Sequence, residues 1–208
     1  MTTEREWKWE IGSADLLDEI AGAPLPEGVE GGDWRTSRLE NRYFDTRDRR
    51  LSAAAAAFRA RRHEDDRSVL LLTLKEGHRR EGAFHRMVEI EGRVPDFDPL
   101  EPWRTEAAPV RRLVELVGRR PVEVLVRFET SRLCRELRSP SGGGAVLALD
   151  TTRWADGGFF RELELELSAD GKGDRWERWM LGLARRHRLV PSEETKLARA
   201  MKRMAAER

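Results

Sequence analysis

Short segments of this chain alternate between charged and apolar residues, and neighbouring charges on one segment share a sign. The clearest segment spans residues 159–167, where Glu162, Glu164 and Glu166 alternate with leucines. Successive side chains of a β-strand point to opposite faces, so this period of two predicts a strand with one acidic face and one apolar face. A chain with several such segments is expected to form an antiparallel sheet that carries a separate charged surface.

Eight segments are predicted as strands on this basis. They span residues 4–10, 38–44, 58–62, 69–75, 85–91, 123–133, 145–150 and 159–167. Four segments have the one-sided apolar spacing of helices, and a serine begins two of them. They span residues 13–20, 110–117, 174–188 and 192–206. The predicted fold class is α+β, mainly β with flanking helices.

The sorting of charge by sign distinguishes this chain from an ordinary sheet with one wet face. Glu4 and Glu6 form a second acidic row, whereas Arg59, Arg61 and Lys75 form basic rows. Like charges at neighbouring positions repel, so a solvated outer face would usually mix the signs. Rows of charges with one sign are instead expected where a bound ligand of opposite charge compensates them. An ordinary charged β-sandwich, with these rows on its outer surface, is the alternative interpretation.

Acidic and basic rows on one sheet suggest a ligand of definite chemistry. Carboxylates two residues apart on facing strands converge on one point, and their oxygens suit hard cations such as Mg²⁺. Guanidinium and ammonium groups match phosphate oxygens. Because buried charges must be paired, hydrated or bound to metal, a barrel closed around these rows is expected to be a tunnel for a metal-bound polyphosphate.

The composition excludes several other classes of protein. The 39 Lys and Arg residues nearly cancel the 38 Asp and Glu residues, so the basic footprint of a nucleic-acid-binding protein is missing. A single cysteine, Cys134, cannot form an intramolecular disulfide, which suits a reducing cytoplasm. No apolar run is long enough for a signal peptide or a membrane span. We expect one cytoplasmic domain over residues 1–208, as a monomer or homodimer, with neither a membrane nor a nucleic acid as partner.

Several short motifs follow one another along the chain. Residues 4–8 read EREWK, residues 58–61 read FRAR and residues 72–75 read LTLK. The others are YFDT at 43–46 followed by Leu51, the acidic pairs Glu89/Glu91 and Glu164/Glu166, and ETKL at 194–197. In sequence and in order they resemble the ExExK, L-R-x-R, L-T-x-K and later motifs of the CYTH domain family, the triphosphate tunnel metalloenzymes. One such motif is weak evidence, but this order over most of the chain is specific.

The resemblance implies an eight-stranded antiparallel β-barrel tunnel and a metal-dependent triphosphatase activity on phosphoanhydrides. It implies Mg²⁺ or Mn²⁺ as cofactor, held by Glu4, Glu6, Glu164 and Glu166 with help from Asp150 and Glu162. The substrate phosphates would be held by Lys8, Arg59, Arg61, Lys75 and Lys196. The first four of these would also stabilise the charge that develops during catalysis. Glu89 and Glu91 would face the tunnel, where they order water or pair with the cations.

Two arginines in the segment 123–133 are candidates for one role in phosphate binding. They are Arg127 and Arg132, which lie an odd number of residues apart, so without a bulge they cannot both point inward. We expect Arg127 to be the inward one. The chain departs from the family pattern at Glu129, where a basic residue is common, at Thr195, which replaces a serine, and in the alanine run 53–57, where a glycine is missing.

The identity of the substrate is open at this point. Inorganic triphosphate is favoured, because the sequence shows no clear pocket for an organic group. Hydrolysis of thiamine triphosphate, cyclisation of ATP as in class IV adenylyl cyclases, and non-catalytic binding of a polyphosphate or nucleotide are the alternatives. The chain has no Ser/His or Cys/His motif, which agrees with a reaction that depends on positioning and charge neutralisation.

Overall fold

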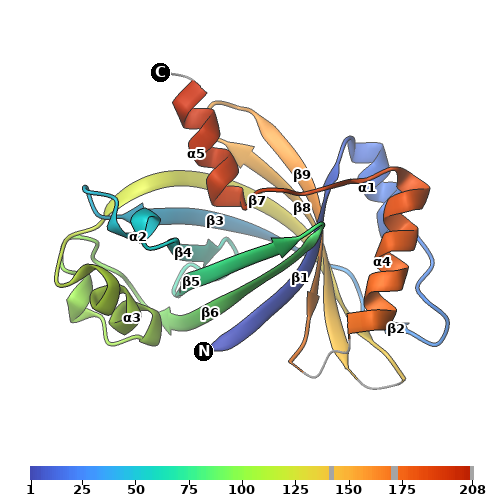
Figure 1. The fold of residues 1–208 in the computed structure, drawn as a ribbon, viewed down its shortest axis with the longest axis horizontal. Coiled ribbons are helices and arrows are strands. Elements are labelled where there is room, and N and C mark those ends of the chain that lie inside the picture. The colour runs from blue at the N-terminus through green and yellow to red at the C-terminus, as the bar shows by residue number, and fades with distance from the viewer. Residues whose placement is uncertain (141–142, 170–172, 207–208) are drawn as a thin grey trace.

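An antiparallel sheet closes on itself into a barrel in the computed structural model, which describes residues 1–140, 143–169 and 173–206 (Figure 1). Within these ranges eight long strands form the barrel wall. They are β1 (Thr2–Ile11), β3 (Arg35–Asp45), β4 (Ala56–His63), β5 (Leu70–Glu81), β6 (Phe84–Val94), β7 (Glu123–Arg138), β8 (Gly144–Trp154) and β9 (Phe159–Leu167). Their spatial order is β1-β6-β5-β4-β3-β7-β8-β9, and β9 pairs with β1 to close the barrel. The expected eight-stranded antiparallel barrel is therefore confirmed.

Two short strands and several helices flank this barrel. The strand β2 (Glu30–Gly31) pairs with β7, and β10 (Val190–Pro191) pairs with β1. The helices are α1 (Ala14–Ala21), α2 (Arg50–Ala53), the 3₁₀-helix η1 (Pro102–Arg104), α3 (Ala108–Val117), α4 (Gly173–His187) and α5 (Lys196–Ala206). Figure 1 shows α1 and α4 together at one side of the barrel and α3 at the opposite side. No helix in the described part of the chain is long and apolar enough to cross a membrane.

The apolar faces of the strands point outward and lie beneath the helices. Leu165 of β9 shares a buried cluster with Trp176 and Met180 of α4. On the opposite side, Leu74 of β5 packs in a cluster with Leu113 of α3. Burial of apolar surface contributes about 25 cal/mol per Å². The barrel wall is thus stabilised from outside, and its interior is left to the charged faces of the strands.

The register of the strands sets charges of opposite sign beside one another inside the barrel. Lys8 of β1 lies opposite Glu164 of β9, and Arg132 of β7 lies opposite Asp150 of β8. Residues directly opposite in antiparallel strands point to the same face, so these side chains share the interior. The prediction that the sign-sorted faces point into one enclosed space is confirmed.

One end of the barrel is filled by aromatic side chains and α5. Tyr43, Phe128 and Trp154 form a buried cluster with Ala200 of α5. Phe128 stacks on Tyr43 with ring centroids 5.6 Å apart and meets Trp154 edge-on at 4.9 Å. Inward-facing apolar residues at this end exclude water, so the polar part of the interior is limited to the middle of the barrel and its other end.

The last helix begins later than expected from the sequence. Ser192 was predicted to cap it, but the Ser192 hydroxyl donates to Glu162 in the barrel interior at 2.7 Å. The Ser192 amide donates to the carbonyl of Lys8, which fastens this segment to β1. The helix α5 starts at Lys196, and the Thr195 hydroxyl accepts from the amide of Ala198 as a cap would. The charge-assisted hydrogen bond to Glu162 and the backbone bond to Lys8 hold Ser192 against the barrel, away from the first amides of the helix, which explains the wrong prediction.

The YFDT segment has a structural role at the end of β3. Asp45 is buried, and its carboxylate accepts hydrogen bonds from the amides of Thr46, Leu51 and Ser52 and from the hydroxyl of Ser52. The first amides of a helix have no partner inside the helix, and this carboxylate accepts hydrogen bonds from two amides of α2. Asp45 thereby fastens α2 to the end of β3.

The alanine run contains a residue in the left-handed region. Ala55 follows α2 and has φ of 51°, at the point where the chain reverses into β4. This conformation costs an L-residue about 1–2 kcal/mol and favours glycine after a helix. The glycine missing from the run therefore has a physical counterpart in this strained alanine.

Ala55→Gly is expected to stabilise the protein by about 0.5–1 kcal/mol, because relief of the left-handed strain exceeds the added entropy of the unfolded chain. The melting temperature should rise by about 2 °C. Ala53→Gly, inside α2, is the matched control and should lower stability by about 0.5–1 kcal/mol. Thermal unfolding of both variants checks the prediction, and a lower melting temperature for Ala55→Gly would contradict it.

Candidate functional site

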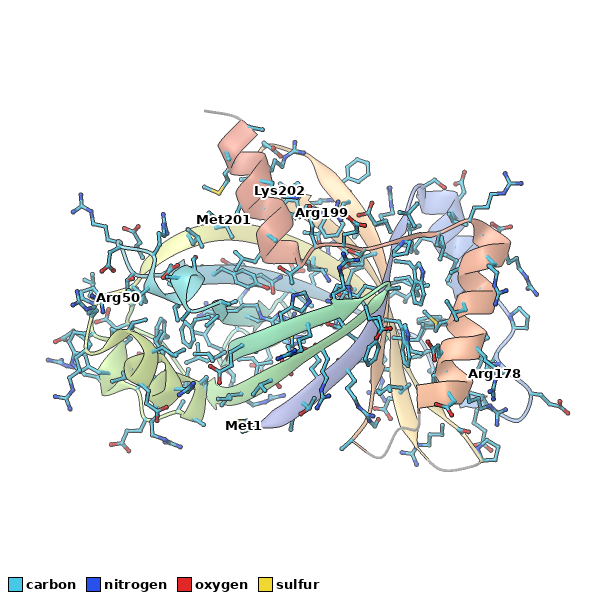
Figure 2. The ribbon with its side chains drawn as sticks, in the orientation of Figure 1. Met1, Arg50, Arg178, Arg199, Met201 and Lys202 are labelled. Atoms are coloured by element: carbon cyan, nitrogen blue, oxygen red, sulfur yellow. The ribbon has the colours of Figure 1, made fainter. Side chains whose placement is uncertain are left out.

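A group of charged side chains is enclosed by the barrel, whereas surface residues such as Arg50 and Arg178 point away from it (Figure 2). Each of the enclosed residues at the centre is less than a tenth exposed: Glu4, Glu6, Lys8, Arg59, Asp150, Glu162 and Glu164. The other sequence-predicted residues that share this interior are Arg61, Lys75, Glu89, Glu91, Arg132, Glu166 and Lys196. Charges at this depth persist only when other charges or a ligand compensate them.

The interior carboxylates nearest α5 are neutralised by the protein itself. Lys196 Nζ lies 2.9 Å from both Asp150 Oδ2 and Glu162 Oε2, and it also contacts Glu164. Arg132 holds Asp150 with two parallel hydrogen bonds of 2.8 and 2.7 Å. Although burial opposes ionisation, Lys196 and the neighbouring cations hold the pKa of Glu164 well below its usual range. These three carboxylates are thus paired with cations of the protein.

Lys8 joins this paired region to the acidic row of β1. Its ammonium lies 2.9 Å from Glu6 Oε1 and 3.2 Å from Glu164 Oε1. One cation thus serves two carboxylates. Burial raises the pKa of Glu6 to about 8. The attraction of Lys8 opposes this rise, and repulsion from Glu4 and Glu164 cancels part of that attraction. Added positive charge in the barrel would therefore favour the ionised form of Glu6 at neutral pH.

A second cluster of carboxylates lies toward β6. Glu4, Glu89 and Glu166 each offer an oxygen, and the three oxygens lie within 4.8 Å of one another. Lys75 reaches Glu4 at 2.5 Å and Glu89 at 3.1 Å. Glu166 has no ion pair among the described residues. Burial and repulsion from Glu4 and Glu89 raise the pKa of Glu166 to about 7.

This second cluster fits a hard divalent cation. Its donors are carboxylate oxygens alone, the ligands that Mg²⁺ and Mn²⁺ prefer. Its negative charge exceeds the charge of Lys75, as the raised pKa of Glu166 indicates. Glu89 was expected to face the tunnel and to order water or pair with the cations; it pairs with Lys75 and also lies beside Glu4 and Glu166, across the strands β1, β6 and β9. The cluster is therefore the better candidate for a metal site than the paired carboxylates near α5.

The wall beside these clusters holds two arginines, Arg59 and Arg61, that form no ion pair with any described residue. Arg59 donates to the Thr73 hydroxyl at 3.2 Å, and its buried Nε has no hydrogen-bond partner in the described part of the chain. Arg61 donates to the Asn41 side chain at 3.1 Å. Burial and repulsion from Arg59 and Arg132 lower the pKa of Arg61 to about 9. An anion between these guanidinium groups would relieve their repulsion, and phosphate matches their geometry.

The expectation for the two arginines of β7 is wrong in its choice of residue. Arg127 is exposed and lies opposite Arg42, on the outer face of the barrel. Arg132 faces the interior, where it contacts Asp150 and Glu164. The irregular register between β3 and β7 falls before Arg127, so no bulge separates the two arginines and their faces alternate strictly. Glu129 is also exposed on the outer face, so it does not weaken the interior for anions.

Sequence reasoning missed several uncharged residues of the interior. Asn41 is 1% exposed and links Arg61 to the Thr130 hydroxyl. Tyr43 lies two residues further along β3, and despite its burial the nearby arginines and Lys75 lower its pKa. Both lie on the same face of a predicted strand, so the period of two could have identified them. Their lack of charge left them out of the search.

The stability of the metal-free protein is expected to fall as pH rises from about 6.5 to 8.5. The pKa values of Glu6 and Glu166 lie at about 8 and about 7, above the ordinary 4.5, so the folded chain binds more protons than the unfolded chain in this window. The pKa of buried His85 is lowered from 6.5 to about 4, so its opposite contribution ends only by about pH 7.5 and offsets a small first part of the loss. The expected loss is about 2–3 kcal/mol, or roughly 5 °C or more in melting temperature.

Thermal unfolding in EDTA across this pH range checks the prediction. Saturating Mg²⁺ at pH 8.5 should restore most of the lost stability, because a cation removes the cost of ionising these carboxyls. Glu166→Gln should flatten the pH dependence, since the amide does not titrate. A melting temperature that stays constant or rises between pH 6.5 and 8.5 would contradict the raised pKa values.

Comparisons with known proteins agree with this geometry. The CYTH domain matches residues 3–201. No curated protein sequence matches the chain. Among solved structures, a proposed adenylyl cyclase from Hippeastrum, HpAC1, described as having a dominant triphosphatase activity, has a TM-score of 0.74 at 20% identity and covers 94% of this chain and 93% of its own.

Two further solved structures have the same fold. A proposed adenylate cyclase from Bacillus halodurans has a TM-score of 0.65 at 20% identity, with 96% of this chain and 98% of that chain covered. The PH1819 protein from Pyrococcus horikoshii OT3 has a TM-score of 0.57 at 16% identity, with 95% and 99% covered. At these identities the likeness concerns the fold alone.

Proposed function

Because the chain belongs to the CYTH domain family, we propose that it is a divalent-metal-dependent triphosphatase for which inorganic triphosphate is a sufficient substrate. One observation carries the proposal. A carboxylate cluster with excess negative charge, formed by Glu4, Glu89 and Glu166, lies in the same enclosed barrel as buried arginines that have no ion-pair partners among the described residues. A triphosphate with a cation is the ligand that compensates both.

In this proposal Glu4, Glu89 and Glu166 hold Mg²⁺ or Mn²⁺. The bound cation supplies charge neutralisation of the phosphate oxygens. Lys75 contacts Glu4 and Glu89, so it keeps two of the ligands in place and leaves Glu166 to be ionised by the cation. Glu6 adds a fourth carboxyl group near these three. Lys8 contacts both Glu6 and Glu164, and so it keeps the carboxylate of Glu6 oriented toward β9.

Arg132 is already held by Asp150 and Glu164, so the guanidinium groups of Arg59 and Arg61 bind the phosphates and hold the chain of phosphates extended. Each can offer two parallel N–H donors to phosphate oxygens. They also stabilise the charge that moves to the leaving oxygen when water attacks the terminal phosphorus. Lys196 acts at a distance from the phosphates, because it neutralises Asp150, Glu162 and Glu164 and so lets three carboxylates share the barrel with an anion.

A substrate panel tests this function. The purified protein is incubated with inorganic triphosphate, thiamine triphosphate or ATP, each with Mg²⁺, with Mn²⁺ or with EDTA, and phosphate, pyrophosphate and cyclic AMP are assayed. Metal-dependent release of one phosphate and one pyrophosphate from inorganic triphosphate is expected. Cyclic AMP as the product from ATP, or no phosphate release from any triphosphate, would refute the proposal.

A further inference from the structure

Three arginines that face the barrel interior lie directly opposite a hydrogen-bond acceptor on a neighbouring strand. The pairs are Arg132 with Asp150, Arg61 with Asn41, and Arg59 with Thr73. Directly opposite residues of antiparallel strands point to the same face, so each acceptor reaches its arginine across the strands. The three acceptors are a carboxylate, an amide and a hydroxyl, in that order. One arginine is therefore held by a charged partner, and the other two are held by neutral ones.

The amide of Asn41 is fixed in one orientation by its own neighbours. Its Nδ2 donates to the Leu39 carbonyl at 3.2 Å and to the Thr130 hydroxyl at 3.4 Å. Its Oδ1 is then the atom that accepts from Arg61 Nε, at 3.1 Å. Asn41 is buried, so the amide cannot turn over without leaving a donor or an acceptor unpaired. Arg61 is thus held through Nε alone, and its two terminal nitrogens have no hydrogen-bond partner in the described part of the chain.

The hydroxyl of Thr73 has the corresponding place beside Arg59. It accepts from Arg59 Nη2 at 3.2 Å and donates its own proton to Glu91 Oε1 at 3.1 Å. Thr73 is buried, and its hydroxyl links the guanidinium group to that carboxylate through two hydrogen bonds. Arg59 is therefore oriented without a direct ion pair to any residue that the structure describes.

A neutral acceptor orients an arginine without cancelling its charge. Burial opposes the charge of Arg132, but Asp150 and Glu164 outweigh it and raise the pKa of this arginine well above its usual value. Arg61 has no such compensation, and burial together with repulsion from Arg59 and Arg132 lowers its pKa to about 9. An uncompensated charge in a buried position is a cost that a bound anion removes.

We propose that Asn41 and Thr73 are positioning residues of the triphosphate site. Each aims one guanidinium group at the phosphates through a neutral acceptor and leaves its charge for the anion. This inference rests on the proposed triphosphatase function and names what orients its phosphate-binding groups. A carboxylate at either position would hold the arginine equally well but would take the charge that the phosphate needs.

A double-mutant cycle with Arg61 tests the role of Asn41. Asn41→Ala is expected to lower kcat/KM for inorganic triphosphate about 10–100-fold, because a hydrogen bond to a charged group is lost. In the Arg61→Ala background the same substitution should cost less than about threefold, since the group that Asn41 orients is gone. Binding of inorganic triphosphate in EDTA, measured by calorimetry, should show the same pattern. Equal losses in both backgrounds would assign Asn41 a role in the fold alone and overturn the proposal.

Asn41→Asp tests whether the neutrality of the acceptor matters. The carboxylate can still accept from Arg61 Nε but pairs with its charge, so inorganic triphosphate should bind about 100-fold more weakly than to the wild type, and more weakly than to Asn41→Ala. Ser131→Asp, on the exposed outer face of β7, adds the same charge to the protein and should change the affinity by less than about twofold. Wild-type affinity in Asn41→Asp would contradict the proposal.

Thr73 provides a second test if the Asn41 variants do not fold. Thr73→Val keeps the shape of the side chain without the hydroxyl and should lower kcat/KM about tenfold. Thr73→Ser keeps the hydroxyl and should retain most of the activity, so equal activities in these two variants would overturn the inference. If the wild type hydrolyses no triphosphate, the proposed function fails, and the binding ratios in EDTA still decide whether these residues position an anion site. A wild type that does not bind inorganic triphosphate would overturn both.

Discussion

Glu166→Gln is expected to lower kcat by about 10²–10³-fold while leaving the fold at least as stable as in the wild type. The amide keeps the shape of the side chain but removes the charge that completes the cluster with Glu4 and Glu89. Glu166 has no ion pair among the described residues, so the substitution breaks none. Repulsion from its neighbours raises the pKa of Glu166 to about 7, and a neutral side chain removes that repulsion.

Steady-state kinetics with a Mg²⁺ titration and thermal unfolding in EDTA at pH 8 measure the two effects. Activity should fall at every metal concentration, and the melting temperature should be equal or higher. Glu129→Gln, on the exposed outer face of β7, is the matched control and should change neither quantity. An unchanged kcat for Glu166→Gln would remove this carboxylate from the proposed metal site, and a large fall in melting temperature would assign it a structural role.

Arg59→Ala is expected to lower kcat/KM for inorganic triphosphate by about 10²–10³-fold. Arg59 is 7% exposed, and its buried Nε has no hydrogen-bond partner in the described part of the chain, so its charge is free to bind an anion. Stability without ligand should change little, because Arg59 forms no ion pair with a carboxylate in the part of the chain that the structure describes. Arg59→Lys should restore only part of the activity, since a lysine cannot offer two parallel donors.

A comparison of Arg59→Ala with Arg127→Ala distinguishes anion binding inside the barrel from anion binding on its outer face. Arg127→Ala is the control, because Arg127 lies on the exposed face of the same barrel. Inorganic triphosphate should raise the melting temperature of the wild type and of Arg127→Ala, and it should lose most of this effect in Arg59→Ala. Equal loss of ligand stabilisation in both variants would mean that the anion binds to the general positive charge of the protein and not inside the barrel.

The paired carboxylates explain why we propose fewer metal ligands than the sequence motifs suggest. Glu4, Glu164 and Glu166 belong to motifs of one kind, yet Glu164 is held by Lys8, Arg132 and Lys196, whereas Glu166 lacks such a partner among the described residues. Each cation comes from a segment far from Glu164 in the sequence. Only the register and tilt of strands joined across the barrel decide which carboxylate keeps an unbalanced charge.

Two local predictions failed for related reasons. Ser192 has the sequence context of a helix cap, but its hydroxyl meets Glu162 of β9 and the helix starts at Lys196. Arg127 was chosen over Arg132 although both fit the strand pattern. In each case local sequence did not decide the outcome, which followed from contacts with other strands: Ser192 with Glu162 of β9, and β7 with β3 and β8.

The alternation of charged and apolar residues by itself determined the fold class, the inner and outer faces of most strands and the residue types of the site, because the direction of a side chain on a strand follows from the local backbone. The tertiary structure decided which of those faces met and which carboxylates were left for a cation. It also decided where a cavity opened beside Lys75. The reason is physical: charge pairing and enclosed space depend on distances between atoms of different strands, and these distances exist only after the barrel has closed.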